Sequence, residues 1–205
     1  MDATRLRRAF ERNARGFTDY LSSLFTRTIT DVSLGSRLFF DKETGLDNVL
    51  IRFQDNERQP VELELDNGCR VRIIQRIIPN PDKPEKKVRT ANYSYAYGFG
   101  ENLDEGWVVR YDYVPERAQR DEDYEYPVGH VHFNGHSEAY GRLQMEGKKE
   151  LDRLHFPTRR IGLEDFIEHL VVEMKVPTKR GKEAALEVLA ESRETFENEK
   201  RIRNH

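Results

Sequence analysis

The sequence predicts an α+β fold, in which one antiparallel sheet of about six to seven strands is flanked by an N-terminal helix and two C-terminal helices. Three observations lead to this expectation. Apolar residues recur at helical spacing near both ends of the chain, and between them apolar and polar residues alternate as in half-buried strands. Short turn sequences such as Asp66-Asn67-Gly68 join alternating segments into hairpins. We therefore expect residues 1–205 to form a single domain.

The N-terminal helix is expected from about Thr4 to Leu24, within residues 1–25. Its apolar stripe has spacings near three, four and seven: Leu6, Phe10, Phe17, Tyr20, Leu21 and Leu24. The other face is rich in arginine, namely Arg5, Arg7, Arg8, Arg12 and Arg15. Such a face is either a solvated surface or a patch that contacts RNA.

The sheet is expected within residues 48–135, and its first strand covers about Asn48 to Phe53. A hairpin follows, with a three-residue loop at 66–68 in which Gly68 takes the left-handed conformation. This loop keeps the apolar residues on one face and pairs opposite charges on the other, whereas a two-residue loop would mix the faces. The expected pairs are Leu63 with Val71, Glu64 with Arg70 and Glu62 with Arg72.

Two aromatic strands follow a proline-containing connection at 79–87. The first presents Tyr93, Tyr95, Tyr97 and Phe99 on one face and small residues on the other. The second, 107–113, places Arg110 and Asp112 on the face opposite Trp107, Val109 and Tyr111. We expect these strands to be antiparallel neighbours. An acidic loop at 116–125 leads to a further strand at about Tyr126–Phe133.

The C-terminal helices are expected within residues 162–203. The first begins at Gly162-Leu163-Glu164-Asp165, carries its apolar stripe as far as Met174, and is stopped by Pro177. The second runs from about Gly181 to Arg201 and has few apolar residues after Ser192. Its charged end is therefore a candidate surface for a protein partner.

Charge and cysteine content exclude several classes of protein. The 34 basic and 37 acidic residues nearly cancel, so nucleic acid would have to bind to a local patch. The single cysteine, Cys69, excludes an internal disulfide and a thiolate zinc cluster. No apolar run approaches the roughly 18 residues of a membrane span, and the first residues lack a signal-peptide pattern. We expect a soluble cytoplasmic protein, and self-association stays open.

The strongest candidate for chemistry is His130-x-His132, because alternate residues of a strand project from one face. If the strand at 107–113 lies beside it, Arg110 and Asp112 would join the two imidazoles on that face. Arginine can bind a phosphate, aspartate can fix an imidazole tautomer, and two histidines can serve as base and acid. This set would suit cleavage of RNA without a metal cofactor, in which the ribose 2′-hydroxyl is the nucleophile.

Two other interpretations of this face stay open. The four residues can form a cross-strand ion network that binds no substrate. Alternatively, a divalent transition metal can bind to His130, His132, His136 and Glu138, with Asp112 as a further ligand. For the RNA hypothesis, Tyr93, Tyr95 and His136 are the candidate substrate contacts, although an aromatic row is also the usual core face of a strand.

Residues 93–174 resemble the TumE-type toxins of bacterial toxin–antitoxin systems. The resemblance is carried by four motifs in order: Tyr93-Ser94-Tyr95, Arg110-Tyr111-Asp112, Pro127 before His130-x-His132, and a helix beginning Leu163-Glu164-Asp165. It implies a growth-inhibiting protein that acts on RNA and is neutralised by a DNA-binding antitoxin. The alternative is a non-catalytic protein that binds a partner through its charged terminal helices.

Overall fold

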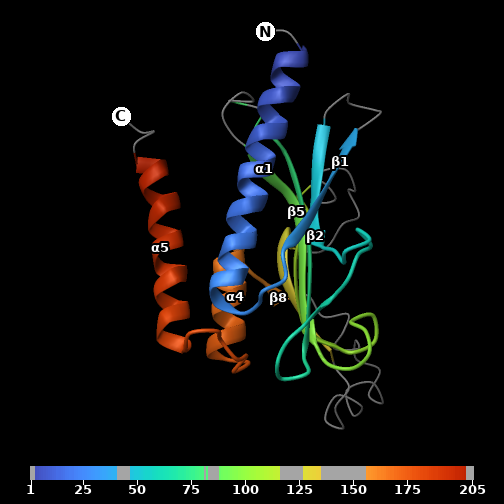
Figure 1. Ribbon diagram of the computed structural model, residues 1–205, viewed down its shortest axis with the longest axis vertical. Helices are drawn as coiled ribbons and strands as arrows, with labels where there is room; N and C mark the ends of the chain where they lie inside the picture. Colours follow the sequence, from blue (N-terminus) through green and yellow to red (C-terminus); the bar gives the residue numbers. More distant parts are fainter. Residues whose placement is uncertain are drawn as a thin grey trace.

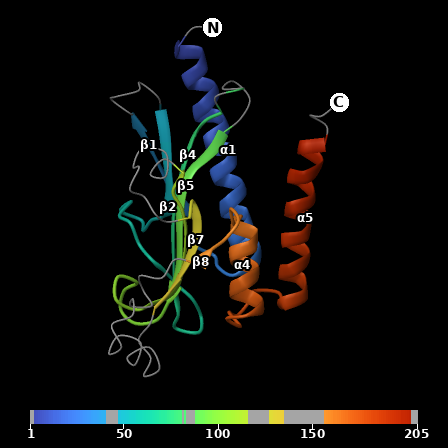
Figure 2. The ribbon, with the colours of Figure 1, turned by 180° about the vertical axis from the view of Figure 1, so that it is seen from behind.

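The computed structural model describes residues 3–40, 47–80, 82, 88–115, 127–134 and 156–201. Its helices are α1 (Ala3–Thr28), α4 (Leu163–Val172) and α5 (Lys182–Arg201). Its strands are β1 (Leu34–Phe40), β2 (Asp47–Phe53), β3 (Leu63–Glu64), β4 (Arg70–Pro79), β5 (Val88–Gly98), β6 (Trp107–Tyr113), β7 (Gly129–Phe133) and β8 (Phe156–Pro157). The helices lie on one side of the sheet (Figure 1), and the view from behind gives the same arrangement (Figure 2).

The sheet is antiparallel throughout, with the order β1-β2-β4-β5-β6-β7-β8, and β3 pairs with β4. The expected α+β class is therefore confirmed. The sheet begins earlier and ends later than expected, because β1 and β8 lie outside residues 48–135. The start of β1, Leu34-Gly35-Ser36, lacks a strong strand pattern, and β8 has only two residues, so neither segment resembled a strand in sequence.

The hairpin between β3 and β4 has the predicted three-residue loop. Leu63 pairs with Val71 and Glu64 with Arg70, and Gly68 has a φ of 75°. The Arg72 guanidinium also lies 3.5 Å from the Glu62 carboxylate, as the charge pattern predicts. This confirms that the alternation of charged and apolar residues determined the register of the hairpin.

The core lies between the sheet and the helices. Phe10, Leu21 and Leu24 of the predicted α1 stripe are buried there, and α1 continues one turn beyond Leu24 to Thr28. Helix α4 ends at Val172, well before Pro177, so the expected stop at that proline is wrong. A residue with positive φ, Lys175, lies in the connection that follows, so the chain has left the helix before it reaches the proline.

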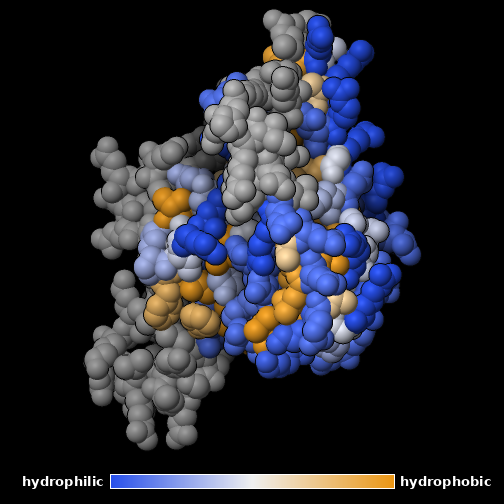
Figure 3. All heavy atoms as spheres, turned by 90° about the vertical axis from the view of Figure 1, so that its left-hand side faces the viewer, coloured by the Kyte–Doolittle hydropathy of each residue, from blue (hydrophilic) through white to orange (hydrophobic). Residues whose placement is uncertain are grey.

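Helix α5 packs on α1 and α4, on the side away from the sheet. The Glu164 carboxylate accepts hydrogen bonds from Tyr20 at 2.7 Å and Ser192 at 2.8 Å, which ties the three helices together. The outer surface on this side is mostly hydrophilic, with a narrow apolar strip (Figure 3). None of the helices within the described ranges is both long and apolar enough to cross a membrane.

Candidate functional site

The polar face of β6 and β7 brings the four predicted residues together. In the β6–β7 register Arg110 lies opposite His132, and Asp112 lies opposite His130. The two strands are thus adjacent, which is the condition on which the predicted arrangement depended. All four side chains project to the face of the sheet that α1, α4 and α5 leave uncovered, because Val109, Tyr111 and Val131 fill the helix-facing side.

The cluster is centred on one carboxylate oxygen, Oδ2 of Asp112. The Nε of Arg110 donates a hydrogen bond to it at 2.9 Å. The Nε2 atoms of His132 and His130 lie 3.3 Å and 4.0 Å from the same oxygen. One negative charge therefore faces three basic side chains, which is the arrangement expected of a group that must stay ionised.

Asp112 is held as a carboxylate by its neighbours. Its burial would raise its pKa, but the hydrogen bond from His132, the charge of Arg110 and a hydrogen bond from Ser94 outweigh this effect and lower the pKa to about 2. Ser94 lies opposite Asp112 in the β5–β6 register. Sequence analysis did not single out Ser94, although the small-residue face of its strand was the available signal.

His130 has a defined tautomer. Its Nδ1 lies 2.6 Å from the carbonyl oxygen of Pro127, which can only accept a hydrogen bond, so Nδ1 carries the hydrogen. Burial lowers the pKa of His130, and the neighbouring His132 acts in the same direction, while the Pro127 carbonyl opposes them. Neutral His130 therefore presents the lone pair of Nε2 toward Asp112 and His132.

Trp107 contacts two members of the cluster, contrary to its predicted position on the opposite face. Its ring lies 5.2 Å from the Arg110 guanidinium carbon and meets the His132 ring edge-on at 6.4 Å. The β5–β6 register shifts between Tyr97 and Gly98, where Trp107 pairs. This irregularity breaks the simple alternation, so the strand pattern alone placed Trp107 wrongly.

The structure does not bring Tyr93 and Tyr95 to the cluster. Both lie on the helix-facing side of β5 with exposures of 3% and 2%. The Tyr93 hydroxyl accepts a hydrogen bond from the Ile161 amide at 2.7 Å, and the Tyr95 ring packs against Phe166 of α4. Their rings belong to the core, so the predicted stacking of substrate bases on them does not fit this fold. The other predicted substrate contact, His136, lies outside the described residues.

The donor atoms of Asp112, His130 and His132 lie within 4.8 Å of one another, close enough to share a metal ion. The predicted metal ligands His136 and Glu138 lie outside the described residues. The hydrogen bond from His130 to a backbone carbonyl is a common support for a metal-bound imidazole. Against this use, the Arg110 guanidinium already occupies Oδ2 of Asp112, so its charge would repel a cation bound there.

Comparison of the chain with protein-family models, with curated proteins and with solved structures finds no match. The geometry of the cluster and of the surrounding sheet therefore carries the functional argument.

Proposed function

We propose that the cluster of Arg110, Asp112, His130 and His132 cleaves RNA by acid/base chemistry that needs no metal ion. The observation that carries the proposal is the convergence of these four side chains on one face, around one carboxylate oxygen. The cluster contains a neutral imidazole, a second imidazole next to a carboxylate, and a guanidinium. These are the groups that transfer of a phosphoryl centre to a neighbouring hydroxyl requires.

Each group has one role in the proposed reaction. His130 Nε2 removes the proton of the ribose 2′-hydroxyl, and the resulting oxygen attacks the adjacent phosphorus. The bond from phosphorus to the 5′ oxygen breaks, and that oxygen takes a proton from His132. The products are a 2′,3′-cyclic phosphate and a 5′-hydroxyl. Arg110 binds the non-bridging oxygens, and Asp112 orients His132 and Arg110.

The exposure of the side chains determines how substrate approaches. The Arg110 side chain is 33% exposed, whereas those of His130 and His132 are 4% exposed. A phosphate therefore meets Arg110 first. The imidazoles are almost fully covered, so we expect phosphate binding at Arg110 and cleavage to be separable steps.

The resemblance to TumE-type toxins supports the same proposal. It would make this chain a growth-inhibiting protein of the bacterial cytoplasm, held inactive by an antitoxin. The charged outer faces of α1 and α5 are the surfaces that we propose for that partner, because Arg8 and Arg12 on α1 and Glu191 on α5 are exposed.

The test is cleavage of a labelled RNA by purified protein in the presence of a metal chelator. We expect His130→Gln and His132→Gln each to slow cleavage by roughly 100-fold or more, as for the loss of a catalytic acid or base. His169→Gln is the matched control, because His169 is a half-buried histidine on α4 that should leave the rate unchanged. Intact RNA after treatment with the wild-type protein, or unchanged rates in both cluster variants, would refute the proposal.

A metal centre is the second candidate, and the grouping of three donor atoms within 4.8 Å favours it. This alternative predicts that Zn²⁺ or Co²⁺ raises the midpoint of thermal unfolding of the wild-type protein and leaves that of Asp112→Asn unchanged. No stabilisation by either ion would exclude it.

A further inference from the structure

The sheet face that α1, α4 and α5 leave uncovered carries a second group of basic side chains, at the opposite end from the cluster. Arg37 of β1, Arg52 of β2 and Arg76 of β4 all project to this face. Leu50 pairs with both Arg37 and Arg76, which places the two arginines on either side of it, and Arg52 lies in the next row on the same face. We call these three residues the arginine group.

The arginine group lacks acidic partners among the described residues, unlike Arg70, Arg72 and Arg110 of the same face. Arg70 pairs with Glu64, Arg72 with Glu62 and Asp104, and Arg110 with Asp112. Arg37, Arg52 and Arg76 form no ion pair with another residue in the described part of the chain. In addition, the Nε of Arg52 is buried and has no hydrogen-bond acceptor there. A buried donor without an acceptor is costly, and the three guanidinium charges without acidic partners in the described ranges favour an anionic ligand at this surface.

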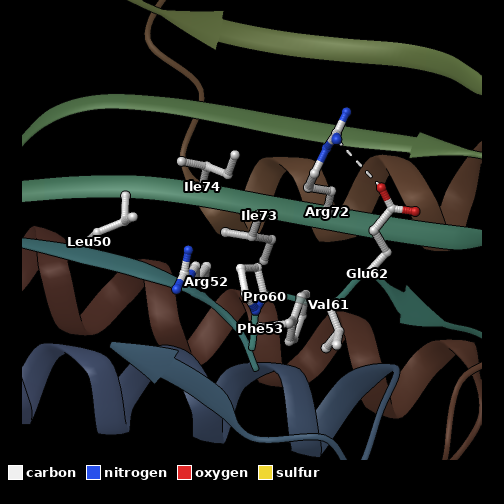
Figure 4. Close-up of a pocket in the computed structure, with 9 residues that line it drawn as sticks. All are labelled: Leu50, Arg52, Phe53, Pro60, Val61, Glu62, Arg72, Ile73 and Ile74. Carbon is white, nitrogen blue, oxygen red and sulfur yellow. Dashed lines mark ion pairs between the residues drawn. The ribbon is translucent and has the colours of Figure 1, made fainter. Parts of the chain in front are cut away.

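A small, largely apolar pocket lies beside Arg52. Its volume is about 220 Å³, below the roughly 300 Å³ at which pockets for drug-sized ligands begin. Leu50, Ile74, Pro60 and Val61 line it together with Arg52, and the ion pair of Arg72 with Glu62 lies at one side (Figure 4). The pocket therefore combines apolar walls with a guanidinium, as contacts to a base and its phosphate require.

The sheet register connects this surface to the cluster. One row across the sheet reads Arg52, Ile74, Ser94, Asp112 and His130, from β2 through β4, β5 and β6 to β7. Four steps between neighbouring strands span roughly 19 Å. Ile74 is 39% exposed in the middle of this row, so an apolar contact lies between the two basic ends.

We propose that the arginine group binds the backbone of single-stranded RNA whose next segment enters the cluster. This inference rests on the proposed function for the choice of RNA, and it adds the path of the strand across β2, β4 and β5. The alternation of guanidinium groups with an apolar pocket and Ile74 favours a chain of phosphates and bases. An acidic protein segment also offers anionic groups to the arginines, so poly-glutamate serves as the competitor of the RNA in the binding experiment.

The experiment measures RNA binding by fluorescence anisotropy at several salt concentrations. The full chain carries His132→Gln, so that the labelled RNA stays intact. Arg52→Ala combined with Arg76→Ala removes two phosphate contacts, which should lower the slope of log affinity against log salt by about 1.4 and weaken binding roughly 25-fold at 0.1 M salt. Arg8→Ala combined with Arg12→Ala removes the same charge from the exposed face of α1 and should change affinity less than twofold.

Three outcomes would overturn the inference. They are unchanged binding in the Arg52 and Arg76 variant, an equal loss in the α1 variant, and displacement of the RNA by poly-glutamate at equal charge concentration. Failure of the proposed function gives a different result. In that case the wild-type protein leaves RNA intact, while RNA binding still depends on Arg52 and Arg76. The arginine group would then be an RNA-binding surface without cleavage activity in the cluster.

Discussion

The Asp112 carboxylate is the residue on which the geometry of the cluster depends most. Its pKa is lowered from 3.8 to about 2, so the folded state favours its ionised form. The contribution of this carboxylate to the free energy of unfolding is fully present above its pKa in the unfolded state. It is lost as pH falls from about 4 toward 2. A shift of this size corresponds to roughly 2 kcal/mol.

We therefore predict that Asp112→Asn lowers the free energy of unfolding at pH 7 by roughly 2 kcal/mol. The variant should also lose less stability than the wild type between pH 4 and pH 2. Asp104→Asn is the control, because that side chain is 79% exposed beside Arg72 and should cost under about 0.5 kcal/mol. Urea unfolding across this pH range measures the free energy of unfolding of both variants. Equal effects of the two substitutions would show that Asp112 is not specially stabilised as a carboxylate.

His169 provides a separate pH prediction, away from the cluster. Burial lowers its pKa, with Glu173 acting in the opposite direction, and its Nε2 is buried without a hydrogen-bond partner within the described residues. Because His169 binds a proton more readily in the unfolded state, neutral His169 contributes to the free energy of unfolding above pH 6.5. This contribution declines as pH falls below 6.5.

His169→Phe keeps a ring for the edge-on contact with Tyr111 and removes the titrating group. We expect this variant to lose less free energy of unfolding than the wild type when pH falls from 7.5 to 5. Chemical denaturation at the two pH values measures the difference. Parallel losses in the two proteins would show that His169 does not titrate differently on unfolding.

At the level of single residues, the sequence predicted the cluster better than its surroundings. Arg110, Asp112, His130 and His132 could be placed on one face because strand alternation is strict in the middle of β6 and β7. Trp107 could not, because the register shifts beside it. The alternating tyrosines of β5 fitted both a core face and a surface that stacks bases. The position of α4 over β5 shows that they belong to the core.

Among the elements, the β3–β4 hairpin offers the sharpest test of local conformation. Gly68 has a φ of 75°, and no atom lies within 4 Å of the position that a Cβ would take. Any effect of Gly68→Ala therefore comes from the backbone, since an L-residue is disfavoured there by about 1 kcal/mol or more.

Gly16→Ala is the matched substitution in α1, where the added methyl also meets no atom within 4 Å. Alanine is favoured over glycine inside a helix, so this variant should gain about 0.5–1 kcal/mol. Thermal unfolding should shift in opposite directions for the two variants. Shifts of the same sign would contradict either the left-handed turn or the helical position.

The elements that sequence analysis missed lacked local signals. Strand β1 has Gly35 and Ser36 next to its first residue, and β8 has two residues, so both depend on pairing with longer strands for their conformation. The end of α4 was also misplaced. Val176 is buried beyond the last helical residue and its amide bonds to the Leu170 carbonyl, so packing of the connection ends the helix before Pro177 is reached.

On the scale of the whole molecule, the fold separates a helix-covered face of the sheet from the face that α1, α4 and α5 leave uncovered, and the proposed function uses the second face. Alternation in each strand predicted two chemically different faces, which is why the α+β class could be predicted. The order of strands requires long-range pairing that no local pattern specifies. The row from Arg52 to His130 became visible only when that order was known.

The most direct measurement of the central claim is the identity of the RNA ends that the wild-type protein produces in the presence of a metal chelator. Attack by the 2′-hydroxyl with His130 as base and His132 as acid predicts a 2′,3′-cyclic phosphate on one product and a 5′-hydroxyl on the other, both detectable by mass spectrometry. Intact RNA, or products that end in a 3′-hydroxyl and a 5′-phosphate, would contradict the claim.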